Sequence, residues 1–296
     1  MNETKTLPSA KTEQVQSTPY LDASRTIAEL VASDMFQRLR LRGMSVEATL
    51  FTAASARANQ LDRQGDATTR KEADSLRIVS QLGEFTHGLE AIRHHHHVEP
   101  LTKRALEAAK LRTVKFNHAV QDMLMHDPTI EFDELVGFLS TMHGVLNRQR
   151  WGDDHAGWAS EANWFHHQLE ITIHGMQQEI FGEQIALSLP GVTVERITDP
   201  HEDLRGIDRW ITMDDVRFPV DFKASYATAR HARSKARHPE QVVYTGVEGP
   251  RFRKALRLDT KDIALRSEQM KRNLELAKQA YIRRQQPLGH IATLGS

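Results

Sequence analysis

The sequence predicts an α+β protein in which an all-α helical bundle comes first and a smaller part with a mixed β-sheet follows. From residue 21 to residue 150, Ala, Leu, Glu, Gln and Arg dominate with helical spacing, and strand signals are almost absent. From about residue 192 onward, short runs alternate apolar and polar side chains, as half-buried strands do. With 296 residues, 39% of them hydrophobic, the chain is long enough to bury a core in each part.

Five helices are expected in the bundle, over residues 24–40, 45–65, 67–93, 100–125 and 132–149. Asp22 or Ser24 can cap the first helix, and Ser45 can cap the second. Pro100 suits a helix start, and the segment 94–100 is expected to separate two helices. We therefore predict a helical domain over residues 21–150, after a polar leader, residues 1–20, that is expected to be disordered. Orientation of substrate, dimerisation and binding of a protein partner all remain open as its role.

The second part, residues 155–286, is expected to contain a long helix, three strands, a short helix and a fourth strand. These elements are predicted near residues 160–187, 192–197, 207–213, 216–224, 227–237 and 241–247. The long helix carries an apolar stripe at helical spacing, whereas the strands alternate. Residues 287–296 are expected to form a flexible tail.

The second and third predicted strands are expected to form a hairpin that brings two aspartates together. If residues 214–215 form its loop, Met213 pairs with Val216 and Asp208 lies directly opposite Asp221. Side chains that face each other in this way have Cβ atoms roughly 4.5 to 5.5 Å apart. Two carboxylates at that distance repel each other unless a cation lies between them.

A lysine joins the two aspartates. Lys223 follows Asp221 at the next position on the same strand face, while the intervening apolar residues face the other way and can pack under a helix. Bringing three charged side chains together in a partly buried place costs free energy, so such a cluster indicates a functional role. Oxygen ligands of this kind suit Mg²⁺, with Mn²⁺ as an alternative, better than zinc. The hairpin therefore predicts a divalent metal site.

At these residues the chain resembles the PD-(D/E)XK nuclease superfamily, which has the restriction-endonuclease-like fold. In that superfamily an aspartate on one strand and an (Asp or Glu)-x-Lys on the next bind the metal and position the attacking water. Asp208 corresponds to the first, and the run Asp221-Phe222-Lys223 to the second. Ile207 stands in place of the family's proline, and Asp221 is the less common choice of acid. The order αβββαβ is also the family's, and the resemblance covers about residues 160–285.

The resemblance implies a Mg²⁺-dependent nuclease that hydrolyses phosphodiester bonds, with DNA favoured over RNA and an endonuclease favoured over other types. Asp208 and Asp221 would hold the metal, the backbone carbonyl of Phe222 would be a further ligand, and Lys223 would orient the water. One alternative is a nucleic-acid-binding or assembly protein on the same fold with weak or no catalytic activity. The other is that Asp221-Phe222-Lys223 is a chance tripeptide in an unrelated α+β domain.

Many members of the superfamily add a glutamate from the first helix. Glu179 is favoured here because of its distance from Asp208 along the chain, and Glu183 follows closely. On the helical wheel Glu183 falls near the centre of the apolar stripe, while Glu179 and Glu170 fall on its flanks. A solvated carboxylate on the helix surface is the alternative reading of each.

Charge is distributed unevenly along a chain whose formal net charge is zero. Residues 223–285 hold sixteen Lys and Arg against six Asp and Glu, a net charge of +10, so the remainder carries −10. A basic flank beside a metal site indicates a phosphate backbone as partner. The expected nucleic-acid contacts are Arg230, Arg233, Lys235, Arg237, Arg251, Arg253 and Lys254.

Composition also excludes several classes of protein. The chain has no cysteine, which rules out a disulfide scaffold and thiolate metal sites and suits a reducing compartment, so we expect a cytoplasmic location. No run of about 18 apolar residues exists, so no membrane partner is expected.

Overall fold

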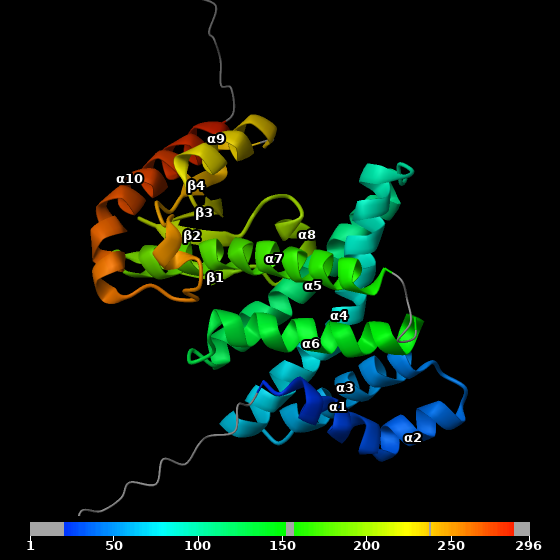
Figure 1. Cartoon of the computed structure of the whole chain (residues 1–296). Coiled ribbons are helices and arrows are strands. Elements are labelled where there is room, and N and C mark those ends of the chain that lie inside the picture. Colours follow the sequence, from blue (N-terminus) through cyan, green and yellow to red (C-terminus); the bar gives the residue numbers. More distant parts are fainter. Residues whose placement is uncertain (1–20, 152–156, 237, 287–296) are drawn as a thin grey trace, which may run out of the picture.

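The computed structural model describes residues 21–151, 157–236 and 238–286. The expected leader, the expected tail and Arg237 lie outside these residues. Figure 1 shows a group of helices, formed by the first part of the chain, beside a layer that contains the sheet. The α+β class with an N-terminal helical region is therefore confirmed.

The helical half contains α1 to α6, whose bounds are Ala23–Ala32, Asp34–Leu41, Val46–Asp62, Ala67–His97, Lys103–His126 and Phe132–Trp151. Asp22 caps α1, where its side chain accepts a hydrogen bond from the backbone N–H of Arg25 at 3.0 Å. Ser45 caps α3 as expected, through the N–H of Ala48 at 3.2 Å. Most of the predicted helices are therefore present with similar bounds.

Three bounds differ from the prediction. The first helix is broken at Ser33, whose extended backbone and side-chain hydrogen bond to the N–H of Phe36 start α2. Helix α4 continues to His97 instead of ending near residue 93, so the run of histidines is its last turn. Helix α5 begins at Lys103 after the cap Thr102, and Pro100 lies in the connection.

The second part begins with α7 and ends with α10. Its elements are α7 (Trp158–Leu187), β1 (Val192–Arg196), α8 (Pro200–Asp203), β2 (Arg209–Met213), β3 (Val216–Lys223), α9 (Tyr226–Lys235), β4 (Val242–Tyr244) and α10 (Thr260–Gln285). The strand order is β1-β2-β3-β4, with β3 and β4 parallel and the other neighbours antiparallel. The predicted order of helix, three strands, helix and strand is therefore present in a mixed sheet. The prediction lacked α8 and α10, and β4 is shorter than expected.

The hairpin has the predicted register. Asp214 and Asp215 form its turn with φ values of 49° and 62°, and Met213 pairs with Val216. Positive φ at both central residues is the geometry of a two-residue turn whose twist matches that of the strands. Regular pairing ends at Arg209 and Val220, immediately before the two aspartates.

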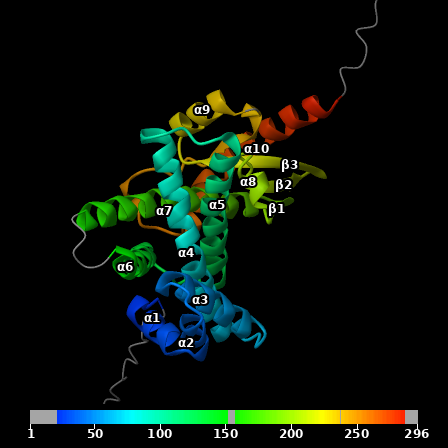
Figure 2. The ribbon, with the colours of Figure 1, turned by 90° about the vertical axis from the view of Figure 1, so that its right-hand side faces the viewer.

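Helix α7 belongs to both hydrophobic cores. Apolar residues from Phe165 to Ile180 pack in the core of the helical half, and Phe181 and Ile185 pack in the core of the sheet. Figures 1 and 2 show α7 running between the helical half and the sheet. Gly182 permits this approach, because a Cβ atom there would lie 2.4 Å from the ring of Phe222.

Among the residues with described structure, none of the helices combines the length and the apolar composition of a membrane span. The cytoplasmic location stays a prediction.

Candidate active site

Asp208 lies at the start of the hairpin and is fixed to β3 by two hydrogen bonds. Gly206, with a φ of 77°, turns the chain between α8 and β2. The backbone N–H of Asp208 donates to the carbonyl of Val220 at 2.8 Å, and its carboxylate accepts the N–H of Phe222 at 2.7 Å. These bonds extend the hairpin past its regular pairing and hold Asp208 beside the end of β3.

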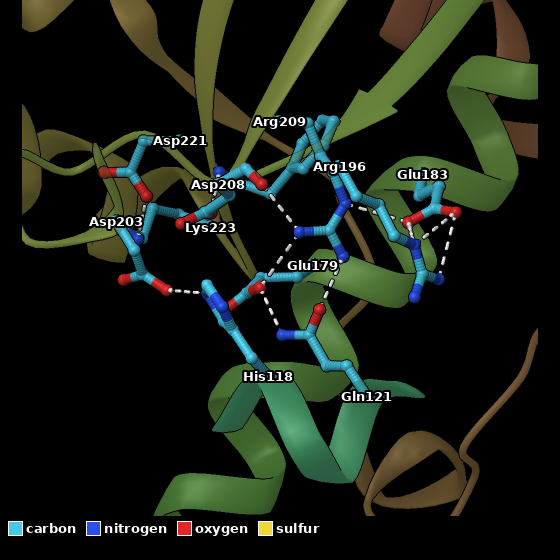
Figure 3. A network of polar contacts seen from close by, with 11 residues as sticks. His118, Gln121, Glu179, Glu183, Arg196, Asp203, Asp208, Arg209, Asp221 and Lys223 are labelled. Carbon is cyan, nitrogen blue, oxygen red and sulfur yellow. Dashed lines mark hydrogen bonds and ion pairs between the residues drawn. The ribbon is translucent and has the colours of Figure 1, made fainter. Parts of the chain in front are cut away.

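Asp221 and Lys223 complete the cluster from β3. The ammonium group of Lys223 forms an ion pair with the carboxylate of Asp221 (Figure 3). Asp208 and Asp221 are 9% and 8% exposed, so both carboxylates lie at the edge of the protein interior, while Lys223 is half-buried. The structure therefore brings together the aspartates and the lysine that the sequence singled out.

The electrostatics of the cluster indicate an excess of negative charge. Burial raises the pKa of Asp208 well above its ordinary value, and the nearby carboxylates of Glu179 and Asp221 raise it further. Burial alone would lower the pKa of Lys223, but Asp208 and Asp221 outweigh that effect and raise it. Lys223 therefore stays charged at neutral pH in the metal-free cluster, and the pKa of Asp208 is raised even with this ammonium group nearby.

Among the three helix glutamates considered, Glu179 lies with the aspartates. Its carboxylate is the largest charged influence on Asp208, and burial raises its own pKa. Glu183 instead receives hydrogen bonds from Arg196 at 3.1 Å and from Arg209 at 2.8 Å. Glu170 pairs with His166 at 3.7 Å on a more exposed stretch of α7. The geometry thus agrees with the preference for Glu179, whose role as a ligand stays a proposal.

Sequence reasoning missed several polar residues around the cluster. Asp203, on α8, raises the pKa of Asp208 and also bonds to His118 of α5 at 3.1 Å. Gln121 of α5 and Arg209 of β2 contact Glu179 (Figure 3). Asp203 could have been suspected, because a capping Asp199 followed by Pro200 predicts a helix start close to Asp208. The residues from α5 have no such local signal.

The expected nucleic-acid contacts divide into two groups. Arg230 and Lys235 are exposed on α9, which starts three residues after Lys223, whereas Arg233 donates to the carbonyl of Val242 at 2.8 Å. The second group lies on another segment: Lys254 pairs with Asp133 of α6 at 2.6 Å, Arg251 pairs with Asp262 of α10, and Arg253 is exposed. Of the two groups, the basic residues of α9 are therefore nearer in the sequence to Asp221 and Lys223.

The donor set suits a hard cation but is not arranged as a finished metal site. Across the described ranges, no three His, Cys, Asp or Glu side chains converge as ligands. The ammonium group of Lys223 forms an ion pair with Asp221, and the backbone N–H of Phe222 donates to Asp208. These contacts already compensate part of the negative charge of the two aspartates. Oxygen donors with uncompensated negative charge fit Mg²⁺ or Mn²⁺. The carbonyl of Phe222 as a ligand stays a prediction.

Comparisons with family models, with curated proteins and with solved structures give no match to this chain. The functional argument therefore rests on the residues and their geometry.

Proposed function

We propose that the chain is a Mg²⁺-dependent nuclease that hydrolyses phosphodiester bonds of DNA and is related to the PD-(D/E)XK superfamily. The observation that carries the proposal is the meeting of Asp208, Asp221 and Lys223 at the end of the hairpin, with Glu179 alongside. Burying the carboxylates of Asp208, Asp221 and Glu179 close together is unfavourable without a metal ion. Active sites commonly retain such unfavourable arrangements.

Each residue has a role that its chemistry supports. Bound Mg²⁺ would lower the pKa of a water and polarise the scissile phosphate. Asp208 and Asp221 would hold the metal, with Glu179 as a further ligand directly or through water. Lys223 has a raised pKa in the metal-free cluster, because Asp208 and Asp221 outweigh the effect of burial. It would orient the water and offset the charge that develops on the phosphate.

The charge of the surface beside the site supports a nucleic acid as substrate. Arg230 and Lys235 are exposed on α9, which starts three residues after Lys223, and exposed bases of this kind can contact a phosphate backbone. The substrate that we propose is DNA, with an endonuclease mode of cleavage.

A second candidate function is binding of nucleic acid without cleavage. It is favoured by one observation, which is that Lys223 and the amide of Phe222 already engage the two aspartates. If this arrangement persists in the presence of metal, the fold would serve as a binding or assembly module.

Cleavage assays separate the two candidates. Purified protein is incubated with duplex, single-stranded and branched DNA and with RNA, each with Mg²⁺ or Mn²⁺. We expect DNA cleavage by the wild type and a loss of about 100-fold or more in Asp221→Asn and Lys223→Met. Asp215→Asn, which removes an exposed carboxylate in the turn and keeps a residue that tolerates positive φ, is the matched control and should retain activity.

Binding of DNA without any cleavage in either metal would favour the second candidate. Full activity in Asp221→Asn or Lys223→Met would remove the proposed site.

A further inference from the structure

The helical half reaches the candidate site through one face of α5. His118 and Gln121 are neighbours on that face, since they are three residues apart on a helix. His118 contacts Asp203 at 3.1 Å, and Gln121 is 5% exposed and points at Glu179 (Figure 3). Figures 1 and 2 both show α5 extending from the helical half toward α8. Side chains from the two parts of the chain therefore meet beside the aspartates.

Gln121, Glu179 and Arg209 form a closed ring of hydrogen bonds. The Nε2 atom of Gln121 donates to Glu179 Oε2 at 2.6 Å, and its Oε1 atom accepts from Arg209 Nη2 at 2.9 Å. Arg209 Nη1 donates to the same oxygen of Glu179 at 3.3 Å. The opposite orientation of the Gln121 amide would set its oxygen against the carboxylate and its NH₂ group against the guanidinium. Only one orientation satisfies all three groups.

Arg209 contacts Glu179 at 3.3 Å, which is longer than its hydrogen bonds to other acceptors. It also donates to Glu183 at 2.8 Å and to the backbone carbonyl of Asp208 at 2.6 Å. Its side chain is 3% exposed, so solvent offers few replacement partners. The shorter contact to Glu179 comes from Gln121, and without it this half-buried carboxylate would be held by the longer contact from Arg209.

We infer that Gln121 is a positioning residue that holds the carboxylate of Glu179 toward Asp208, so that the helical half completes the metal site. The inference rests on the proposed function, because Glu179 matters here as a metal or water ligand. Groups that orient ligands in this way commonly change metal affinity about 10- to 100-fold when they are removed.

The test measures Mn²⁺ alone, by titration calorimetry on the full chain, so that it does not depend on cleavage. Gln121→Met keeps the length of the side chain and removes its hydrogen bonds, and we expect it to weaken Mn²⁺ binding about 10-fold or more. In a Glu179→Gln background the same change should have no further effect, since the two residues act through one contact. If Gln121→Met does not fold, Gln121→Asn keeps the amide, shortens its reach and carries the same expectation.

Gln177→Met is the matched control. Gln177 is also buried, at 1% exposed, but its amide donates to the carbonyls of Arg253 at 3.2 Å and of Ala255 at 2.6 Å. The control should lose a comparable amount of stability in thermal unfolding and bind Mn²⁺ as tightly as the wild type. In DNA cleavage, Gln121→Met should lower kcat with little change in KM.

Two results would overturn the inference while the proposed function stands. One is unchanged Mn²⁺ affinity in the Gln121 variants beside a wild type that binds Mn²⁺ and cleaves DNA. The other is an equal loss of affinity with and without the carboxylate of Glu179. Failure of the wild type to bind Mn²⁺ at all would overturn the proposed function itself, and this inference with it.

Discussion

At the scale of single residues, Asp208 is held in a place that disfavours its charge. Burial and the carboxylates of Glu179 and Asp221 raise its pKa. A carboxyl group whose pKa is raised on folding contributes stability that is fully present below its unfolded pKa, about 3.9, and is lost as pH rises through the folded value. At neutral pH the raised pKa of Asp208 therefore destabilises the metal-free protein relative to an ordinary carboxyl group.

The consequence can be measured by thermal unfolding at pH 7. In EDTA, Asp208→Asn should unfold at a higher temperature than the wild type, because the amide can still accept the N–H of Phe222. Mg²⁺ should raise the unfolding temperature of the wild type and not that of the variant. A lower unfolding temperature for the variant in EDTA, or an equal response of both proteins to Mg²⁺, would contradict this account.

His143 makes stability depend on pH in the helical half. Its ring stacks on Phe165 with centroids 3.4 Å apart and accepts a hydrogen bond from Asn147 at 2.8 Å, and burial lowers its pKa to about 3. A depressed pKa contributes stability that is present above the unfolded pKa of about 6.5 and is lost as pH falls toward the folded value. Between pH 7.5 and pH 5 this single group should cost about 2 kcal/mol of the free energy of unfolding.

Urea unfolding of the wild type and of His143→Phe at both pH values tests this prediction. The variant should lose about 2 kcal/mol less than the wild type between the two pH values, because its ring does not titrate. An equal loss in both proteins would show that other groups set the pH dependence.

The sequence predicted the central charges because their spacing is local, whereas their supports come from far along the chain. Asp208, Asp221 and Lys223 belong to one hairpin whose register follows from its turn. Gln121 and Glu179 are 58 residues apart in the sequence, and no local sequence pattern predicts a contact over that separation. Sequence reasoning therefore found the centre of the site and missed its surroundings.

At the scale of elements, Gly182 couples α7 to β3. An alanine there would place its Cβ atom 2.4 Å from the Phe222 ring, so helix and strand must separate at a cost of about 1 to 3 kcal/mol. Gly175, on the same helix, has nothing within 4 Å of that position, and Gly175→Ala should stabilise by up to about 1 kcal/mol.

Chemical unfolding and cleavage assays on the two alanine variants check this contrast. Gly182→Ala should also lower Mg²⁺-dependent cleavage, since Phe222 lies between Asp221 and Lys223 and its N–H holds Asp208. Equal free energies of unfolding for the two variants would mean that the close contact between Gly182 and Phe222 does not limit the size of the residue at position 182.

Strand alternation and two helix caps were predictable, whereas a break inside a helical pattern and a very short helix were not, and the long helix α10 was also missed. The alternation in β2 and β3 and the caps Asp22 and Ser45 were sufficient to place their elements. The break at Ser33 interrupts an otherwise continuous helical pattern, because its side chain caps the next helix instead of continuing the first. Helix α8 has only four residues, which is too short for periodicity to reveal it.

At the scale of the whole molecule, α7 packs in both cores, so we expect the two parts to unfold as one cooperative unit. Phe85 is fully buried in the helical half, where it stacks on Phe116 at 4.2 Å and meets Phe165 of α7 at 6.0 Å. Phe85→Ala should cost about 3 to 5 kcal/mol. Because α7 packs in both cores, we expect the loss of stability to extend to the sheet. Hydrogen exchange should then show reduced protection of backbone amides in β2 and β3 as well as in α4. Unchanged protection in the strands would mean that the two parts unfold independently.

The most direct test of the central claim is the anomalous signal of Mn²⁺ in crystals of the protein. We predict a peak between the carboxylates of Asp208 and Asp221, with oxygen atoms roughly 2.0 to 2.2 Å from the ion and with the ammonium group of Lys223 displaced from Asp221. If crystals in saturating Mn²⁺ show no peak at this position and Lys223 still forms its ion pair with Asp221, the proposed metal site is contradicted.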